Sequence, residues 1–160
     1  MRTSPILVLA GATLLTLATA PLAAHHAFGG EFDSNRPVLI KGKISKVELV
    51  NPHAWIHIEA REVTLAGEKK DLKSPEVWAV EGGTPNTLLR RGITRESLKP
   101  GTVLVIDGYQ ARDHSLLRAN GRNVTYPDGR KLFLGSSGTG APVDGADPTE
   151  TPKGRGRGGR

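Results

Sequence analysis

The sequence predicts a small, mainly β fold, and three observations carry this prediction. Apolar and polar residues alternate with a period of two in several short runs, most regularly over residues 53–59. Clusters of Pro, Gly and Asn, such as residues 51–52 and 99–101, separate these runs as turns do. One segment, residues 84–92, instead has the start signals, spacing and stop signal of a short helix.

The first expected strand covers residues 38–49. Ile40 and Ile44 fall on the same face and are expected in the core. The alternation changes phase near Lys46, which predicts a bulge or bend, and Gly42 would allow the strand to coil sharply. We therefore expect a long, coiled first strand.

The second expected strand covers residues 53–59 and follows the turn at Asn51-Pro52. Ala54, Ile56 and Ile58 would face the core, and the opposite face would carry polar and aromatic residues, namely His53, Trp55, His57 and Glu59. Residues 65–74 are expected as a charged loop, and residues 76–81 as a third strand.

The expected helix begins with Thr84 as its N-cap and Pro85 at its first position, and ends at Gly92. Leu88 and Leu89 are expected to point inward. After it come three further strands and the turns that separate them: a fourth strand at 102–111, a loop at 113–115, a fifth strand at 117–125, a hairpin turn at 126–130 and a sixth short strand at 131–134.

This order of elements favours an OB-like, closed barrel. The expected fold has five to six antiparallel strands and one short helix between the third and fourth strands. An open antiparallel sandwich is the alternative, because counting strands does not distinguish the two.

Residues 1–24 have the composition of an export signal peptide. A positive charge precedes an uncharged apolar run over residues 6–20, and small residues lead to a cleavage site after Ala24. The run of about fifteen residues is shorter than the roughly 20 that a membrane-spanning helix needs. We therefore expect a mature chain that begins at His25 and is periplasmic or secreted.

The mature chain is expected to contain a single folded domain, residues 25–135, and a disordered tail, residues 136–160. The tail is rich in Gly, Pro, Ser and Thr and has almost no large apolar residue, so it cannot offset the entropy cost of ordering. Residues 154–160 are similar to RNA-binding tails, but export would separate them from RNA. Nucleic acid is therefore not an expected partner.

The chain of 160 residues has a formal charge of +6 and no cysteine. The lack of cysteine excludes a disulfide framework and a lipidated cysteine anchor. We therefore expect no membrane insertion after signal cleavage. The positive charge predicts a general attraction to anionic surfaces and says little about the fold.

Several short motifs occur in an order and at a spacing that resemble the DUF6152 family of small exported bacterial proteins. The likeness runs from about His25 to Leu134, with Ile93 where the family pattern has Trp. The resemblance implies an exported single-domain protein and assigns no chemistry. The motifs are His25-His26-Ala27-Phe28, Asn51-Pro52-His53-Ala54-Trp55-Ile56, Gly83-Thr84-Pro85-Asn86, Leu89-Arg90-Arg91-Gly92, Ser97-Leu98-Lys99-Pro100-Gly101 and Asp128-Gly129-Arg130-Lys131-Leu132-Phe133.

Metal binding is the most specific function that the residues indicate, and copper is the preferred metal. A mature N-terminal His25 presents its α-amine and imidazole together, and neither group holds its proton strongly near neutral pH. Such nitrogen ligands bind Cu(II) more strongly than Ni(II) or Zn(II). The expected ligand set is His25 and His26 with one of His53 or His57.

His53 and His57 are not expected to bind the same ion. At ~3.3 Å per strand residue they lie about 13 Å apart on one face. His53 is preferred because it follows the Asn51-Pro52 turn, where the N-terminal segment can fold back. The alternative is a structural role, in which His53 braces the turn.

Two further candidate surfaces would bind an anionic ligand or an envelope protein. Arg90, Arg91 and Arg95 lie at or after the helix, and guanidinium groups suit carboxylates and phosphates. The alternative is a basic helix end stabilised by the helix dipole.

Trp55 forms the other surface, since an exposed Trp can stack on a ligand or partner. Alternatively, Phe28 or Phe32 of the N-terminal segment covers Trp55. Such packing would also bring His25 towards His53.

The sequence has no nucleophile elbow, P-loop, HExxH motif or cysteine nucleophile. Asp113-His114-Ser115 is interpreted as a turn. Copper-dependent oxidation is the remaining enzymatic alternative, but residues 25–135 offer little room for a large substrate surface. We therefore expect a non-enzymatic binding module of the cell envelope, with a metal ion or an envelope protein as its partner.

Overall fold

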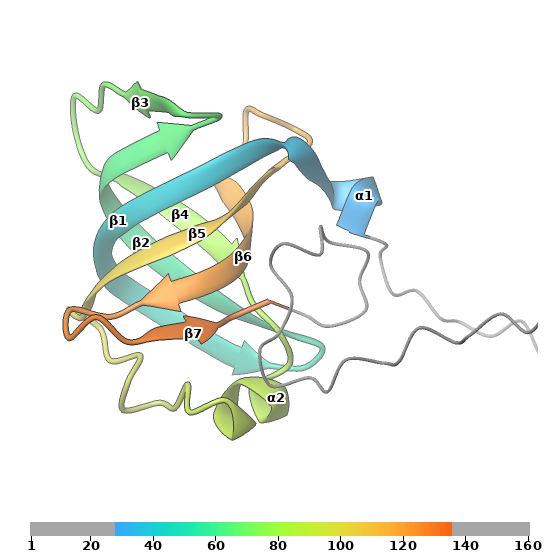
Figure 1. Cartoon of the computed structure of the whole chain (residues 1–160), viewed down its shortest axis with the longest axis vertical. Coiled ribbons are helices and arrows are strands. Elements are labelled where there is room, and N and C mark those ends of the chain that lie inside the picture. Colours follow the sequence, from blue (N-terminus) through green and yellow to red (C-terminus); the bar gives the residue numbers. More distant parts are fainter. Residues whose placement is uncertain (1–27, 136–160) are drawn as a thin grey trace, which may run out of the picture.

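Five strands pair in a closed ring in the computed structural model, which describes residues 28–135 (Figure 1). Around the ring the order is β1, β5, β6, β4 and β2, and β2 pairs again with β1. Two three-residue strands extend it, β3 beside β2 and β7 beside β6. The bounds are α1 Phe28–Glu31, β1 Phe32–Val50, β2 His53–Leu65, β3 Glu68–Lys70, β4 Glu76–Glu81, α2 Pro85–Arg90, β5 Val103–Ala111, β6 Arg118–Thr125 and β7 Lys131–Phe133.

The mainly β fold class is thus confirmed, with seven strands instead of five to six. Three predictions lie outside the described residues: the signal peptide at 1–24, the paired histidines His25 and His26, and the tail at 136–160. Among residues 28–135, no helix has the length and apolar character needed to cross a membrane.

β1 is long and bent, as its sequence predicts. It pairs with β2 on one edge and with β5 on the other, and its register with β2 shifts at Lys41/Gly42 and at Ile44/Lys46. A Cβ atom on Gly42 would collide with the backbone carbonyl of Glu59 and lie 2.8 Å from the Cα of Ala60. The glycine therefore permits the close approach of the two strands.

The expectation of an all-antiparallel sheet is wrong for one pair. β4 and β6 run parallel, with Ala79–Glu81 in register with Arg118–Asn120. The two strands are not consecutive, because the chain passes through α2 and β5 between them. This return path gives β6 the same direction as β4.

The expectation of a loop at residues 65–74 is wrong in part, since β3 forms a hairpin with β2 there. The turn between them places Ala66 at φ 49° and Gly67 at φ 86°. Two-residue hairpin turns of this kind usually have Asn or Asp before the glycine, because few other residues tolerate a positive φ. Because Ala66 is not a residue typical of such a turn, the sequence gives no signal for the hairpin.

The core fills the inside of the ring and receives one face of each of its five strands. Ala54, Ile56 and Ile58 of β2 are fully buried in it, as the alternation predicts. A second cluster consists of Phe28, Phe32, Tyr109 and Ala111 and involves α1. In Figure 1, α1 lies outside the ring.

The helix α2 begins as predicted, with Pro85 in its first turn and the Thr84 side chain accepting a hydrogen bond from the Thr87 backbone N–H. Leu88 is buried at 1% exposure, whereas Leu89 is 59% exposed. The prediction that both leucines point inward is therefore wrong for Leu89, because a helix of six residues presents one narrow face to the ring.

Candidate functional site

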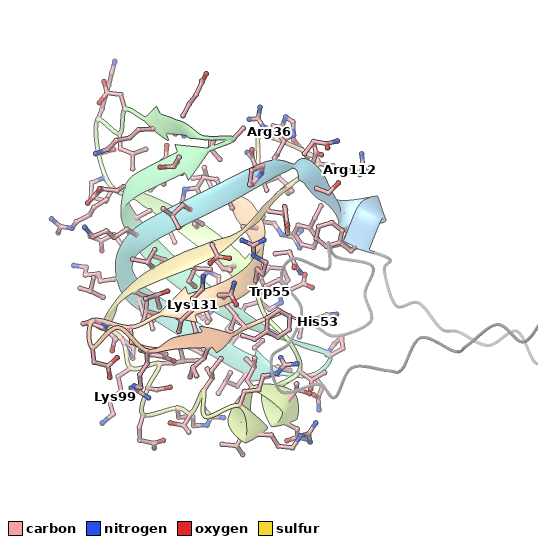
Figure 2. All side chains as sticks on the ribbon, in the orientation of Figure 1. Arg36, His53, Trp55, Lys99, Arg112 and Lys131 are labelled. Carbon is pink, nitrogen blue, oxygen red and sulfur yellow. The ribbon has the colours of Figure 1, made fainter. Side chains whose placement is uncertain are left out.

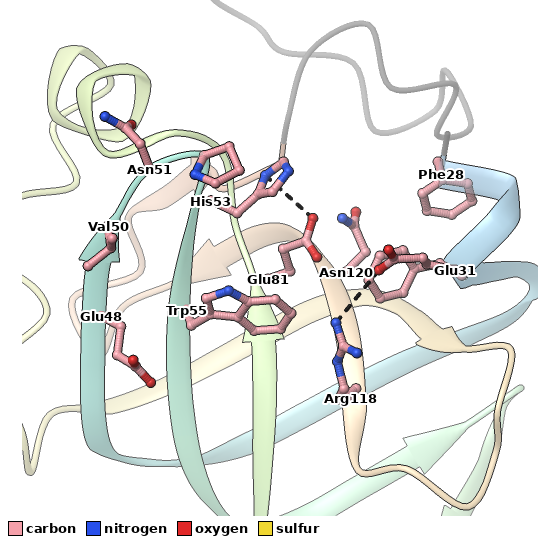
Figure 3. A pocket seen from close by; sticks show the side chains of 12 residues that line it. Phe28, Glu31, Glu48, Val50, Asn51, His53, Trp55, Glu81, Arg118 and Asn120 are labelled. Carbon is pink, nitrogen blue, oxygen red and sulfur yellow. Dashed lines mark ion pairs between the residues drawn. The ribbon is translucent and has the colours of Figure 1, made fainter. Parts of the chain in front are cut away.

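A pocket of about 410 Å³ lies on the outer face of the sheet (Figure 3). Its walls come from β1, β2, β4 and β6, from the turn at Asn51-Pro52 and from the N-terminal segment, which comprises α1 and the start of β1. His53 and Trp55 line it because Ala54 and Ile56, their neighbours in the alternation, face the core. Both lie on the side of the ring where α1 packs (Figure 2).

Strand register brings the polar lining residues together. Trp55 of β2 pairs with Glu48 of β1 on one side and with Glu81 of β4 on the other. Glu81 pairs in turn with Asn120 of β6. Because register partners project from the same face of a sheet, the four side chains form one row across the pocket.

His53 and Glu81 form the most buried titratable pair in the pocket. Their Nδ1 and Oε1 atoms lie 3.5 Å apart, and the two side chains are 28% and 10% exposed. The Nδ1 atom of His53 is buried and has no hydrogen-bond partner within residues 28–135. A buried nitrogen of this kind is costly unless something bonds to it.

Backbone hydrogen bonds hold this pair in place. The Ala54 N–H donates to the Gly83 carbonyl at 3.0 Å, and the Gly82 N–H donates to the Ala54 carbonyl at 2.8 Å. These bonds join Ala54, directly after His53, to Gly82 and Gly83, the two residues after Glu81. The positions of the imidazole and the carboxylate therefore follow from the pairing of β2 with β4.

Arg118 closes another side of the pocket. Its guanidinium lies 4.7 Å from the ring centre of Trp55 and 3.7 Å from Glu31 of α1. The contact with Trp55 is a cation–π interaction. One arginine thus connects β6, β2 and α1.

Aromatic packing fixes the N-terminal segment against the sheet. The rings of Phe28 and Phe32 lie 5.8 Å apart, and Phe28 meets Tyr109 edge-on at 5.4 Å. Both phenylalanines line the pocket with Trp55, as expected for a segment that folds back. The group found over the Trp55 ring is the Arg118 guanidinium, which the sequence does not predict.

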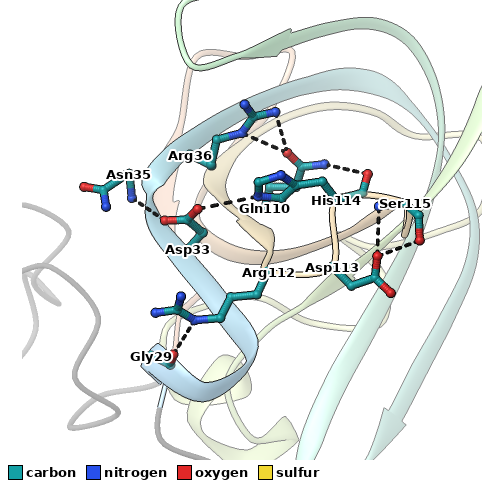
Figure 4. A network of polar contacts seen from close by, with 9 residues as sticks. All are labelled: Gly29, Asp33, Asn35, Arg36, Gln110, Arg112, Asp113, His114 and Ser115. Carbon is teal, nitrogen blue, oxygen red and sulfur yellow. Dashed lines mark hydrogen bonds and ion pairs between the residues drawn. The ribbon is translucent and has the colours of Figure 1, made fainter.

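Polar contacts also attach this segment to the end of β5 and the loop after it (Figure 4). Arg112 donates from its backbone N–H to the Glu31 carbonyl and from its side chain to the Gly29 carbonyl. His114 lies 3.5 Å from Asp33, and Arg36 donates to Gln110. The wall formed by α1 is therefore held by several independent contacts.

His57 lies outside the pocket lining. Its Nε2 atom is 2.8 Å from Oε1 of Glu48. Hydrogen bonds from Lys46 and from His57 lower the pKa of the Glu48 carboxyl. Of the two strand histidines, His53 is the one with a buried, unbonded nitrogen.

The three candidate arginines do not form one group. Arg91 lies over the Phe133 ring at 4.7 Å and donates to the Gly135 carbonyl at 2.7 Å. Arg90 is exposed and donates to Thr87 of its own helix. Arg95 lines a second hollow, of about 330 Å³, beside α2.

Sequence reasoning missed Glu81, Arg118 and Asn120. Glu81 is 7% exposed and Asn120 is 5% exposed, although both are polar residues on the outer face. The N-terminal segment and the turn before β2 form other walls of their pocket, and both are distant in sequence. No local signal in the sequence predicts this burial.

The fold and the pocket define a small, mainly β protein with an acidic, aromatic-lined cavity on the outside of its sheet. The chain belongs to the DUF6152 family, described as a family of unknown function, whose family model matches residues 13–119. This match confirms the family resemblance. No curated protein and no solved structure matches the chain.

Proposed function

We propose that this protein is an exported, non-enzymatic binding module that holds a divalent metal ion in the outer-face pocket, with Cu(II) as the preferred ion. The ligands are His53 and the donors of the mature N-terminus, namely the amine and ring of His25 and the ring of His26. The observation that carries the proposal is the buried Nδ1 atom of His53, which has no hydrogen-bond partner among residues 28–135.

Chain length supports the participation of His25. Phe28 lines the same pocket as His53, and it follows His25 by three residues. An extended chain spans at most about 3.3–3.6 Å per residue, so His25 lies within about 11 Å of Phe28. Cleavage after Ala24 would therefore release an α-amine within reach of the pocket.

The charges of the pocket support a cationic ligand. Glu31, Glu48 and Glu81 line it, against one guanidinium from Arg118. The chain as a whole carries a charge of +6. An acidic pocket on a basic protein concentrates cations locally.

We also propose that the ring is an OB-like barrel. With β3 and β7 set aside, the ring order is first, second, third, fifth and fourth strand, and the third and fifth run parallel. α2 lies between the third and fourth of these strands. An experimental structure with this topology and the tilted strands of a closed barrel would test the proposal.

A second candidate is an interaction module for an envelope protein that uses no metal. The hollow beside α2 supports it, because Leu89 lines this hollow with 59% exposure and Arg95 lies beside it. Its test is co-purification of a partner that Leu89→Ser abolishes and metal removal leaves unchanged.

The metal proposal is tested on protein recovered from the periplasm, with its first residue determined by mass spectrometry. Calorimetric titration with Cu(II) should give one tight site. His53→Ala should weaken it on the order of 10- to 100-fold or more, since even the loss of a group that supports a ligand costs that much. His57→Ala is the matched control and should bind as the wild type does.

A chain that carries extra residues before His25 lacks the free amine on that histidine and should also bind weakly. Native-terminus protein that binds no Cu(II) at micromolar concentration contradicts the proposal.

A further inference from the structure

We propose that Glu81 is a second ligand to the same ion, so that His53 and Glu81 form a half-site built into the sheet. This inference depends on the proposed metal-binding function and adds to it a carboxylate that the sequence does not indicate.

The separation of the two side chains is the first argument. A hydrogen bond between an imidazole nitrogen and a carboxylate oxygen spans about 2.7–3.2 Å. The Nδ1 atom of His53 and the Oε1 atom of Glu81 are instead 3.5 Å apart, although the Glu81 side chain is only 10% exposed. The buried Nδ1 atom of His53 and the Glu81 carboxylate are thus close together without a hydrogen bond between them.

The same separation suits two ligands of one ion. Zn(II) binds nitrogen and carboxylate oxygen at about 2.0–2.2 Å, and at a tetrahedral angle two such ligand atoms lie about 3.4 Å apart. An ion between His53 and Glu81 would therefore require little movement of either side chain.

The donor set defines the class of ion. One imidazole and one carboxylate suit borderline divalent ions such as Zn(II) and Cu(II). Calcium and magnesium prefer sites made of oxygen ligands. The half-site is thus expected to favour Zn(II) or Cu(II).

The described chain does not complete the site. Within residues 28–135, no three His, Cys, Asp or Glu side chains gather closely enough to hold a metal ion. His53 and Glu81 supply two ligands, and the remaining positions would be taken by the N-terminal donors. The half-site alone should therefore bind weakly.

The test compares Glu81→Gln with Glu48→Gln in native-terminus protein. Glu48 lines the same pocket, and its carboxylate contacts Lys46 and His57. Affinities for Zn(II) and for Cu(II) are measured separately by competition with a chromophoric chelator. We expect Glu81→Gln to weaken the affinity for at least one of the two ions by tenfold or more. Glu48→Gln removes one charge from the pocket and no ligand, so it should lower both affinities by a much smaller factor.

Equal affinity of Glu81→Gln and wild type for both ions overturns the inference. If His53→Ala still weakens binding in that case, the proposed function stands without Glu81. If the wild type binds neither ion, both proposals fail.

Circular dichroism establishes whether Glu81→Gln folds. If it does not fold, anomalous diffraction from wild-type crystals grown with Zn(II) or Cu(II) decides. An ion bonded to both His53 and Glu81 supports the half-site, and an ion bonded to His53 without Glu81 overturns it.

Discussion

The guanidinium of Arg118 lies 4.7 Å from the ring centre of Trp55. Its contact with Glu31, at 3.7 Å, extends this relationship to α1. A single side chain thus joins the outer face of the sheet to the N-terminal segment that walls the pocket.

Replacing Arg118 by Gln should loosen that segment without unfolding the ring. The lost cation–π contact and ion pair are worth about 1 kcal/mol together at a half-exposed site. Hydrogen exchange of residues 28–32 should accelerate, while exchange in the core strands stays slow. Arg95→Gln is the control, and equal acceleration in both variants would contradict the role given to Arg118.

Replacing Gly42 by Ala should destabilise the protein strongly. The new Cβ atom would collide with the Glu59 carbonyl, and backbone atoms cannot move aside as a flexible side chain can. We expect a loss of about 3 kcal/mol, at the upper end for over-packing. Urea denaturation measures it, with Gly30→Ala as control, because a Cβ atom there meets no heavy atom within 4 Å.

The two leucines of α2 should respond differently to truncation. Leu88→Ala should cost about 2–5 kcal/mol because it leaves a cavity in the core. Leu89→Ala should change the free energy of unfolding by at most about 0.5 kcal/mol, since this side chain is 59% exposed. Thermal denaturation of both variants tests this. Similar losses of stability in the two would contradict the placement of Leu88 in the core and of Leu89 at the surface.

Asp107 should contribute stability that depends on pH. Burial alone would raise the pKa of this carboxyl, but hydrogen bonds from Arg122 and Asn123 and the charges of Arg122 and Lys131 outweigh it, so the pKa is lowered from its ordinary value of 3.8. A group with a lowered folded-state pKa stabilises the protein above its ordinary value. This stabilisation is lost as the pH falls through the folded value.

Asp107→Asn should therefore cost about 1.5–3 kcal/mol at neutral pH, the range for hydrogen bonds to charged groups. The difference from wild type should shrink as the pH falls below 3.8. Urea denaturation of both proteins at a series of pH values above and below 3.8 measures this difference in the free energy of unfolding. The exposed Asp71→Asn serves as control, and a gap that stays constant with pH would contradict the role of the ion pairs.

Local patterns were enough to predict most of the strands and the start of the helix. The alternation from Ala54 to Ile58 places three side chains in the core, and Thr84 and Pro85 place the start of α2. In each case the signal lies within a few residues of the feature that it predicts. The family was likewise recognisable from short motifs.

Features that depend on distant segments were missed. The parallel pairing of β4 with β6 follows from the path of the chain between them, and the hairpin at Ala66 uses an unusual residue at positive φ. Glu81 is buried in a pocket whose other walls include the N-terminal segment and the turn before β2, and both are distant from it in sequence. For the candidate site, the sequence therefore indicated His53 and Trp55 but not the charged residues around them.

The parallel pairing of β4 with β6 is short, with three residues of each strand in register, Ala79–Glu81 and Arg118–Asn120. Glu81 lies on one side of this seam, and Arg118 and Asn120 lie on the other, so the seam runs beneath the pocket. This is the shortest pairing in the ring, so a local opening there would expose the Glu81 carboxylate to water while the long pairing of β1 with β2 stays intact. A cation held as proposed above would then exchange at the rate of this local opening, without global unfolding.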